Sequence, residues 1–240
     1  MDWFGRRPSA PTPAPTPTPS TWEKDTEAGA KALEEGHLED AERRLQMARE
    51  HASTGTGNDL ELAASLSNLA VVRRRQNDLE GAIDLQQQAL AIRERVTGPE
   101  SAEVASTLNS LGGLYALRDD YSAAEPLLKR ALEIREKVYG ADDRHTAESL
   151  NNLALLYAAA GRPSDAEPLY QRSIAVFEKL QRPVELATTL DNYAALLSEI
   201  DRAAEAEKLE QRAKELREKA PDAKAVEKNK EIQVPWSRHD

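Results

Sequence analysis

The 240-residue sequence contains no cysteine, which excludes disulfide bridges, thiolate catalysis and zinc sites built on cysteine. Aromatic residues make up only 5% of the chain, so a folded core must be built mostly from leucine and alanine. Side chains of this kind suit closely packed helices better than a β-sandwich. The composition therefore favours a helical protein.

Long apolar runs are also missing. The longest, from Leu153 to Ala160, is far too short to span a bilayer. The N-terminal stretch MDWFGRRPSAP lacks the cationic start and apolar run of a secretory signal. We therefore predict a cytoplasmic protein that does not bind membranes.

Acidic residues predominate, with 42 Asp and Glu against 32 Lys and Arg and a net charge of −10. This balance argues against a broad nucleic-acid-binding surface, although it leaves room for a local basic patch. None of the four histidines pairs with another at the spacing of metal ligands on a helix. The chain also lacks a glycine-rich phosphate loop and a Gly-x-Ser-x-Gly motif. We predict that it is not an enzyme and binds no cofactor, metal or nucleic acid.

The N-terminal segment 1–21 is rich in proline and threonine, and six of its residues between positions 8 and 19 are proline. Such a segment has no side chains with which to build a core and favours an extended polyproline conformation. We predict a disordered tail that acts as a spacer. A docking ligand for a proline-recognising domain is the alternative.

From about residue 22 the chain repeats itself at intervals of 41, 42, 42 and 40 residues. Three columns of small residues mark the five copies. The first column is Gly29, Ala70, Gly112, Ala154 and Ala194. The second, twelve residues later, is Ala41, Ala82, Ala124, Ala166 and Ala206. The third, seven residues further on, is Ala48, Ala89, Ala131, Ser173 and Ala213.

Each copy predicts two helices. In the fourth copy, Leu150, Leu153 and Tyr157 share one apolar helical face, and the first helix ends at the sequence Gly161-Arg162-Pro163. The second helix is predicted to open with a capping box at Ser164. One pair of helices cannot bury its apolar face alone, so neighbouring pairs must stack.

These columns resemble the signature of the tetratricopeptide repeat, as do Tyr115 and Tyr157, three residues after the first column. The longer period, with ALEIREKVYG (131–140) and SLNNLALLYAAAGRPSDAEPLYQRSI (149–174), is similar to the kinesin-light-chain-like subfamily. The resemblance covers roughly residues 22–218. It departs from the pattern at Asp25, where the other copies have leucine. It implies an all-α fold, a right-handed α-solenoid of five helix-turn-helix repeats.

We divide the chain into a tail (1–21), the solenoid (22–220) and a C-terminal tail (221–240). The predicted repeats are 22–62, 63–104, 105–146, 147–186 and 187–220. The apolar Ile232, Val234 and Trp236 are unusual for a free tail. We predict either a segment docked over the open end of the last repeat or a partner-binding or self-binding motif.

In this family the first helices line a concave groove that holds peptides, so first-helix residues off the core face are the candidate binding residues. They are Asn68, Val71, Arg74, Arg75, Asn109, Gly113, Leu117, Asn151, Asn152, Leu155 and Asn192. The resemblance implies that the asparagines grip the main chain of a ligand. The alternative is that they bond to the backbone of the neighbouring repeat.

The arginines of the second repeat allow two interpretations. The stem of Arg73 is predicted to cover apolar surface while its head reaches solvent. Arg74 and Arg75 either pair locally with Glu34, Glu35 or Asp78, or form a fork for an acidic ligand group.

We therefore predict an adaptor that binds a protein or peptide partner, with acidic groups as one favoured ligand feature. The alternatives are a self-assembling structural module and a regulatory sensor for a separate enzyme.

Overall fold

The computed structural model describes residues 21–54 and 58–219, and every regular element in these ranges is an α-helix. The helices are α1 (Thr21–Glu34), α2 (Leu38–Thr54), α3 (Asp59–Arg75), α4 (Leu79–Thr97), α5 (Ala102–Leu117), α6 (Tyr121–Tyr139), α7 (Arg144–Ala159), α8 (Pro163–Lys179), α9 (Pro183–Glu199) and α10 (Ala203–Lys219). The predicted all-α class is confirmed. None of the described helices combines the length and apolarity of a bilayer-spanning segment.

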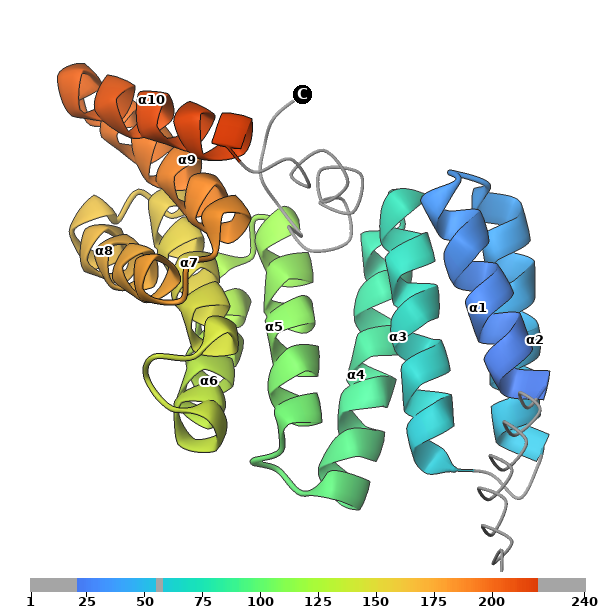
Figure 1. The fold of residues 1–240 in the computed structure, drawn as a ribbon. Coiled ribbons are helices and arrows are strands. Elements are labelled where there is room, and N and C mark those ends of the chain that lie inside the picture. The colour runs from blue at the N-terminus through green and yellow to red at the C-terminus, as the bar shows by residue number, and fades with distance from the viewer. Residues whose placement is uncertain (1–20, 55–57, 220–240) are drawn as a thin grey trace, which may run out of the picture.

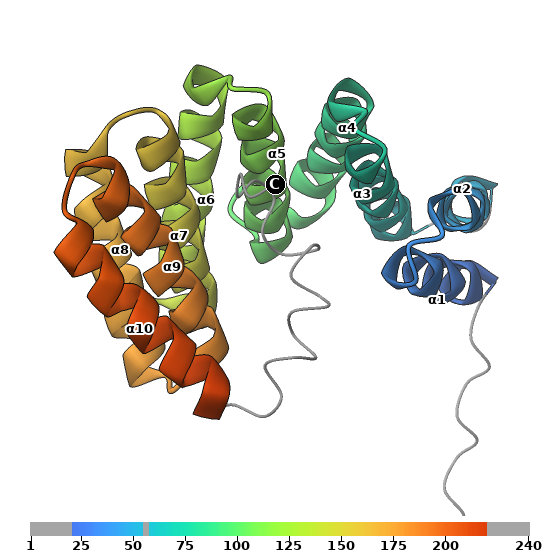
Figure 2. The same ribbon diagram turned by 90° about the horizontal axis from the view of Figure 1, so that it is seen from above.

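The helices form five pairs that stack in chain order. Each odd-numbered helix packs against the even-numbered helix that follows it, and each even-numbered helix then packs against the next pair (Figure 1). The array is curved, and the odd-numbered helices lie on the inside of the curve (Figure 2). Contacts of α1 with α3, of α5 with α7 and of α7 with α9 join them along this side. We call the surface formed by the odd-numbered helices the inner face.

The three columns of small residues form the contacts within and between the pairs. All five alanines of the second column are at most 2% exposed, and the first and third columns are buried as well. Leucines fill the space around them, and Tyr170 and Phe177 are the largest fully buried side chains. The predicted core of leucine and alanine is therefore confirmed. Because alanine and glycine carry so little side chain, the two helices of a pair can approach closely.

The residue that turns the chain from the first to the second helix has a positive φ in every repeat. These residues are Gly36, Asn77, Asp119, Gly161 and Asp201. Glycine, asparagine and aspartate are the residues that adopt this conformation most readily, which explains their choice here.

The capping box predicted at Ser164 is wrong. Helix α8 already begins at Pro163, whose fixed φ suits a first helical position, and its N-cap residue Arg162 makes no side-chain capping bond. In α6 the equivalent Ser122 donates a hydrogen bond of 2.9 Å to Asp120. Asp120 is the N-cap and accepts from the backbone N–H of Ala123. Both helices therefore begin one residue before the serine that was predicted to cap them.

The predicted repeat boundaries fall just inside the odd-numbered helices. Position 63 lies in α3, 105 in α5, 147 in α7 and 187 in α9. As helix pairs, the repeats run from the start of each odd-numbered helix to the end of the following even-numbered one. We number the repeats one to five in this sense.

Repeat one departs from the others through a buried carboxylate. Asp25, at a leucine position of the other repeats, is 7% exposed. Its Oδ2 lies 3.0 Å from Nδ1 of His51, and its Oδ1 lies 3.9 Å from Nη1 of Arg44. Both partners come from α2, so the polar substitution is accommodated within its own repeat.

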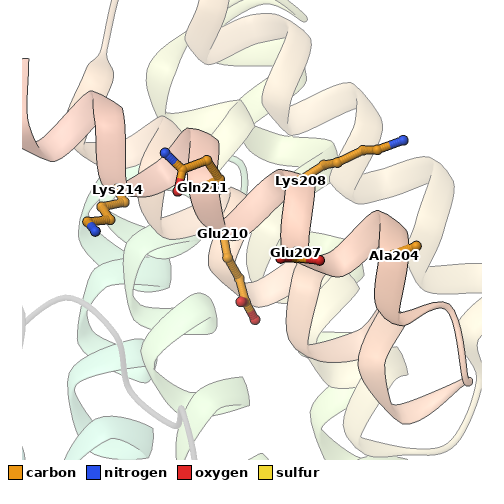
Figure 3. A pocket seen from close by; sticks show the side chains of 6 residues that line it. All are labelled: Ala204, Glu207, Lys208, Glu210, Gln211 and Lys214. Carbon is orange, nitrogen blue, oxygen red and sulfur yellow. The ribbon is translucent and has the colours of Figure 1, made fainter.

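The outer face of α10 is polar. In α8, the face toward the next repeat holds Glu167, Tyr170 and Gln171, which all contact Tyr193 of α9. The equivalent face of α10 is lined by Ala204, Glu207, Lys208, Glu210, Gln211 and Lys214 (Figure 3). All six are exposed, and Glu210 takes the place of the buried Tyr170. The described array therefore ends in a surface that water solvates readily, and not in an open apolar face.

Candidate partner-binding face

The inner face carries equivalent residues at regular intervals along the array. One row, in the last turn of each odd-numbered helix, is Glu34, Arg75, Leu117, Ala159 and Glu199. A second row, one turn earlier, is Ala30, Val71, Gly113, Leu155 and Ala195. Read along the array, the inner face is acidic in repeat one, basic in repeat two, apolar in repeats three and four, and acidic again in repeat five.

The asparagines of the inner face pair with one another from repeat to repeat. Asn152 of α7 donates a side-chain hydrogen bond of 2.9 Å to Oδ1 of Asn109 in α5. Asn192 of α9 donates one of 3.1 Å to Oδ1 of Asn151 in α7. The predicted alternative placed these bonds on the neighbouring backbone, whereas the structure places them on the neighbouring asparagine side chain. We call these four residues the asparagine ladder.

The asparagines of the ladder have further hydrogen-bond donors and acceptors beyond those used in the ladder bonds. A primary amide has two N–H donors and a carbonyl oxygen with two lone pairs, and each ladder bond uses only one of these. Asn109 and Asn192 are half-buried, whereas Asn151 and Asn152 are 8% and 7% exposed. The amide group of Asn109 and the carbonyl oxygen of Asn192 are therefore the most available groups for another molecule.

Apolar side chains lie beside the ladder. Leu117 and Leu155 are half-buried and pack against the largest core cluster of the described residues. Gly113 is buried and lies between Val71 and Leu155 in the second row. Val71 packs against the core of repeats one and two. These residues offer a small apolar surface with hydrogen-bonding groups at its edge, which is the usual composition of a peptide-binding surface.

Arg73 contacts two acids, Glu42 in α2 and the α4 N-cap residue Asp78. Its Nη2 donates to Oε1 of Glu42 in α2 at 2.7 Å, and its Nη1 lies 3.7 Å from Asp78. Gln76 donates to the other oxygen of the same Glu42 carboxylate at 2.7 Å. The side chain of Arg73 is 38% exposed, so its head reaches solvent as predicted and also pairs with the carboxylate of the preceding repeat.

Arg75 binds the end of the preceding inner helix. Its Nη1 donates a hydrogen bond of 2.7 Å to the backbone carbonyl of Leu33, in the last turn of α1. The carbonyls of a last helical turn have no partner within the helix, and a cation there is also favoured by the helix dipole. Of the acids predicted as local partners, Glu35 contacts Lys31 and His37, and Asp78 caps α4.

The inner-face acids of repeats four and five are partly neutralised by neighbouring arginines. Asp191 forms an ion pair with Arg217 of α10. Glu148 accepts from Arg144 at 2.8 Å and lies 3.8 Å from the buried Arg135. Glu199 is exposed and forms no ion pair with another described residue. Within residues 21–54 and 58–219, the Glu199 carboxylate of repeat five thus has no ion-pairing cation.

The sequence analysis missed a recurrent acid that joins successive repeats. Glu125 accepts hydrogen bonds from Tyr157 at 3.1 Å and Arg162 at 2.7 Å, and Glu167 accepts from Tyr193 at 2.8 Å and Arg202 at 2.7 Å. Each glutamate directly follows an alanine of the second column, so its recurrence beside that column could have identified it from the sequence.

Hydrogen bonds from neighbouring side chains favour the ionised form of Glu125 and Glu167. Bonds from Lys129, Arg162 and Tyr157 lower the pKa of the Glu125 carboxyl below its ordinary value. Bonds from Arg202 and Tyr193 lower the pKa of Glu167 in the same way. These clusters hold the repeats in register and, by doing so, fix the spacing of the inner face.

Comparison with known proteins agrees with this architecture. The sequence model described as "Tetratricopeptide repeat" matches residues 28–95, 61–137 and 103–179, which together span more than half of the chain. The chain belongs to the tetratricopeptide repeat family. Arrays of this family are protein-interaction scaffolds. Among curated proteins, none matches this tetratricopeptide repeat chain in sequence.

Solved structures share the fold of this tetratricopeptide repeat array. BtubC (BKLC) from P. vanneervenii is 24% identical with a TM-score of 0.73, over 81% of this chain and 79% of that one. A putative kinesin light chain from Podosopora anserina is 19% identical with a TM-score of 0.66, over 81% and 93% of the two chains. A Rap protein complexed with Competence and Sporulation Factor is 16% identical with a TM-score of 0.68, over 83% and 55%. These likenesses concern the fold.

Proposed function

We propose that this protein is a non-catalytic adaptor whose inner face binds an extended segment of a partner protein. The observation that supports this most directly is the asparagine ladder, which runs across repeats three to five with donors and acceptors left over. Main-chain amides of an extended peptide present donors and acceptors at regular intervals, so a ladder of amides can hold them whatever the peptide sequence.

The neighbours of the ladder supply the sequence preference. Leu117 and Leu155 favour an apolar side chain of the ligand opposite repeats three and four. Arg74 and Arg75 in repeat two add guanidinium donors, which favour a carboxylate at one end of the bound segment.

The Rap protein is complexed with Competence and Sporulation Factor on a related fold. That complex supports partner binding as the function of such an array, and it also keeps a sensor role for this chain among the alternatives. Self-assembly by stacking of the C-terminal end is disfavoured, because the outer face of α10 carries charged and polar residues.

The proposal is tested with peptides selected from a random display library on the immobilised full chain. Replacing Asn109 and Asn192 by alanine should weaken the selected peptides at least tenfold, because these two amides are the more exposed members of the ladder. The matched control is Gln211→Ala, which removes an amide from the exposed outer face of α10 and should leave binding unchanged. If the two variants bind equally well, the inner face is not the binding site.

A further inference from the structure

We propose that the junction between repeats two and three is a hinge, at which the inner face opens and closes to fit a ligand that spans both sides. Repeats one and two form one arm of the array, and repeats three to five form the other. The use of this hinge by a ligand rests on the proposed function. The hinge itself follows from bonds that recur at the other junctions of the described array and are not made at this one.

The junction between repeats two and three lacks the carboxylate that joins the described repeats elsewhere. The residue after the second-column alanine is Glu42 in repeat one, Glu125 in repeat three and Glu167 in repeat four. Each of these carboxylates binds an arginine of the following repeat. In repeat two the same position is Ile83, which is 5% exposed and lies in an apolar cluster with Leu111 of α5. Apolar packing is not directional, so it resists a small rotation less than hydrogen bonds do.

The asparagine ladder also stops at this junction. Asn109 and Asn152 join repeats three and four, and the same two positions one repeat earlier hold Ser67 and Ser110. Ser67 donates to Gln86 of its own repeat at 3.2 Å, and Ser110 donates to a backbone carbonyl of its own helix at 3.1 Å. These two serines therefore leave α3 and α5 without a ladder bond.

The inner helices α3 and α5 also have less contact with each other than other neighbouring inner helices. The contacts that join α1 with α3, α5 with α7 and α7 with α9 have no counterpart of similar extent between α3 and α5. In both views α3 lies farther from α5 than α5 lies from α7 (Figures 1 and 2). Gly113 contributes to this separation, because α5 has no side chain at the position where α7 has the half-buried Leu155.

Side-chain bonds across this junction run from α4, which lies on the outer side of the curve (Figure 2). They join Glu80 to Arg118, Gln87 to Tyr115, Arg93 to Thr107, and Glu94 to Arg130. The Glu80 side chain is 76% exposed, compared with 25% for Glu125, and exposed ion pairs contribute little to rigidity. These bonds hold the two arms together on the outer side, so a rotation there changes the width of the inner side.

The hinge lies between two groups of candidate ligand contacts. Val71 and Arg75 belong to the first arm, whereas the ladder begins at Asn109 in the second arm. A rotation at the junction changes the distance between these groups. A ligand that contacts both arms therefore stabilises one curvature of the array, in the same way that ligands stabilise one setting of other hinged proteins.

The test measures distances between spin labels on cysteines introduced into the full chain, which has no cysteine of its own. The labelled residues are exposed and share one position of the repeat, two residues after the third column; they are Glu50, Ala91, Glu133, Ala175 and Glu215 in repeats one to five. Residues 220–240, whose docking over the last repeat the sequence predicts, lie outside the described part of the chain and stay unchanged in every variant.

Three label pairs, each spanning two junctions, locate the motion by double electron–electron resonance. Glu50→Cys with Glu133→Cys and Ala91→Cys with Ala175→Cys both include the hinge, and Glu133→Cys with Glu215→Cys is the control without it. Both hinge pairs should give distance distributions at least twice as wide as the control. If only the Glu50 and Glu133 pair is wide, the motion belongs to repeat one and the proposal is overturned. Equal widths for all three pairs also overturn it.

A rebuilt ladder bond tests the cause of the motion. Ser67→Asn combined with Ser110→Asn places an amide pair between α3 and α5 at the positions that Asn109 and Asn152 occupy in the next junction. This double variant should narrow both hinge distributions and leave the control pair unchanged. Ser67→Asn alone is the matched control and should not narrow them, because the added amide has no amide partner. An unchanged width in the double variant would overturn the proposal.

Peptides selected by display on the immobilised chain test the use of the hinge. A bound peptide should narrow both hinge distributions, because it contacts both arms, and a peptide that binds without narrowing them overturns this use. If the widths of all three pairs are equal and peptides still bind, only the hinge fails and the adaptor function stands. If no library peptide binds, the adaptor function fails, and the label pairs without ligand still decide whether the hinge exists.

Discussion

The side-chain amide of Asn152 in α7 donates a hydrogen bond of 2.9 Å to the side-chain oxygen of Asn109 in α5, so the residue type that we propose as the ligand contact also joins adjacent repeats. The two roles are compatible because a primary amide makes up to four hydrogen bonds. A ladder fixed in this way presents its remaining groups in a set orientation. The entropy lost when a ligand binds is then smaller than it would be for freely rotating side chains.

Replacing Asn152 by alanine should lower the free energy of unfolding by about 1 kcal/mol, the usual contribution of one side-chain hydrogen bond. Asn152 is 7% exposed, so water cannot fully replace the lost bond. The control is Asn68→Ala in repeat two, because the side chain of the half-buried Asn68 makes no hydrogen bond with another described residue. Urea denaturation of both variants measures the difference, and equal losses would show that the ladder bond contributes nothing.

Arg75 is expected to matter more for the stability of repeat one than for the rest of the array. Arg75→Ala removes the guanidinium bond to the carbonyl of Leu33, which keeps only the 3.2 Å bond from the N–H of Gly36. It also leaves Lys31 as the basic residue of the last turn of α1. We expect a loss of about 1 kcal/mol, concentrated in α1 and α2, because repeat arrays transmit stability only between neighbours. Hydrogen exchange measures it: faster exchange spread evenly over α7 to α10 would contradict this prediction.

Acid should weaken the junction between repeats four and five. Arg202 and Tyr193 lower the pKa of Glu167 in the folded chain, so the ionised carboxylate stabilises the fold above the ordinary glutamate pKa of 4.5. This contribution is lost as the pH falls from about 5 through the lowered folded-state pKa. Glu167→Gln should therefore cost about 0.5–1 kcal/mol at pH 7 and less at pH 3.

Tyr193→Phe provides an intermediate case for the same junction. It removes one donor to Glu167 and retains Arg202, so its loss at pH 7 should be smaller than that of Glu167→Gln. Thermal unfolding at a series of pH values compares the three proteins. A loss for Glu167→Gln that is constant from pH 3 to pH 7 would contradict the electrostatic origin.

The fold was predictable because small residues recur at a regular spacing along the sequence. The small-residue columns led by Gly29, Ala41 and Ala48 recur five times, and only stacked helix pairs bury such columns together. The helix starts were less predictable, because the positive-φ turn residue and Pro163 set the start of α8, and not the capping pattern at Ser164. The residues before Ser164, which the capping motif does not include, determine where the helix begins.

The inner-face residues were also predictable in position, since helical periodicity places them opposite the core. Their contacts were not. That Asn152 would reach Asn109, and Arg75 the carbonyl of Leu33, depends on the rotation between successive repeats. The size of the side chains packed between helices sets this rotation, and the rotation angle cannot be derived from a single sequence.

The close approach of helices in repeat three gives a last prediction, on Gly112. A Cβ added at Gly112 would lie 2.7 Å from Cγ of Leu128, a fully buried residue of α6. Repeat one has the same combination, with Gly29 against Leu45. Where the first column holds Ala70 or Ala154, the residue sixteen positions later is Gln86 or Tyr170. Glutamine is unbranched at Cγ and the tyrosine ring is flat there, whereas leucine carries two methyl groups on a tetrahedral Cγ.

Gly112→Ala should therefore destabilise the chain, although alanine favours a helix by about 1 kcal/mol over glycine. Overpacking costs about 1–3 kcal/mol, so we expect a net loss of about 1 kcal/mol in urea denaturation. Leu128→Met, which carries an unbranched chain at the contact, should remove most of the penalty when combined with Gly112→Ala. A double-mutant cycle measures this coupling, and a Gly112→Ala variant more stable than the wild type would show that the helices separate at no cost.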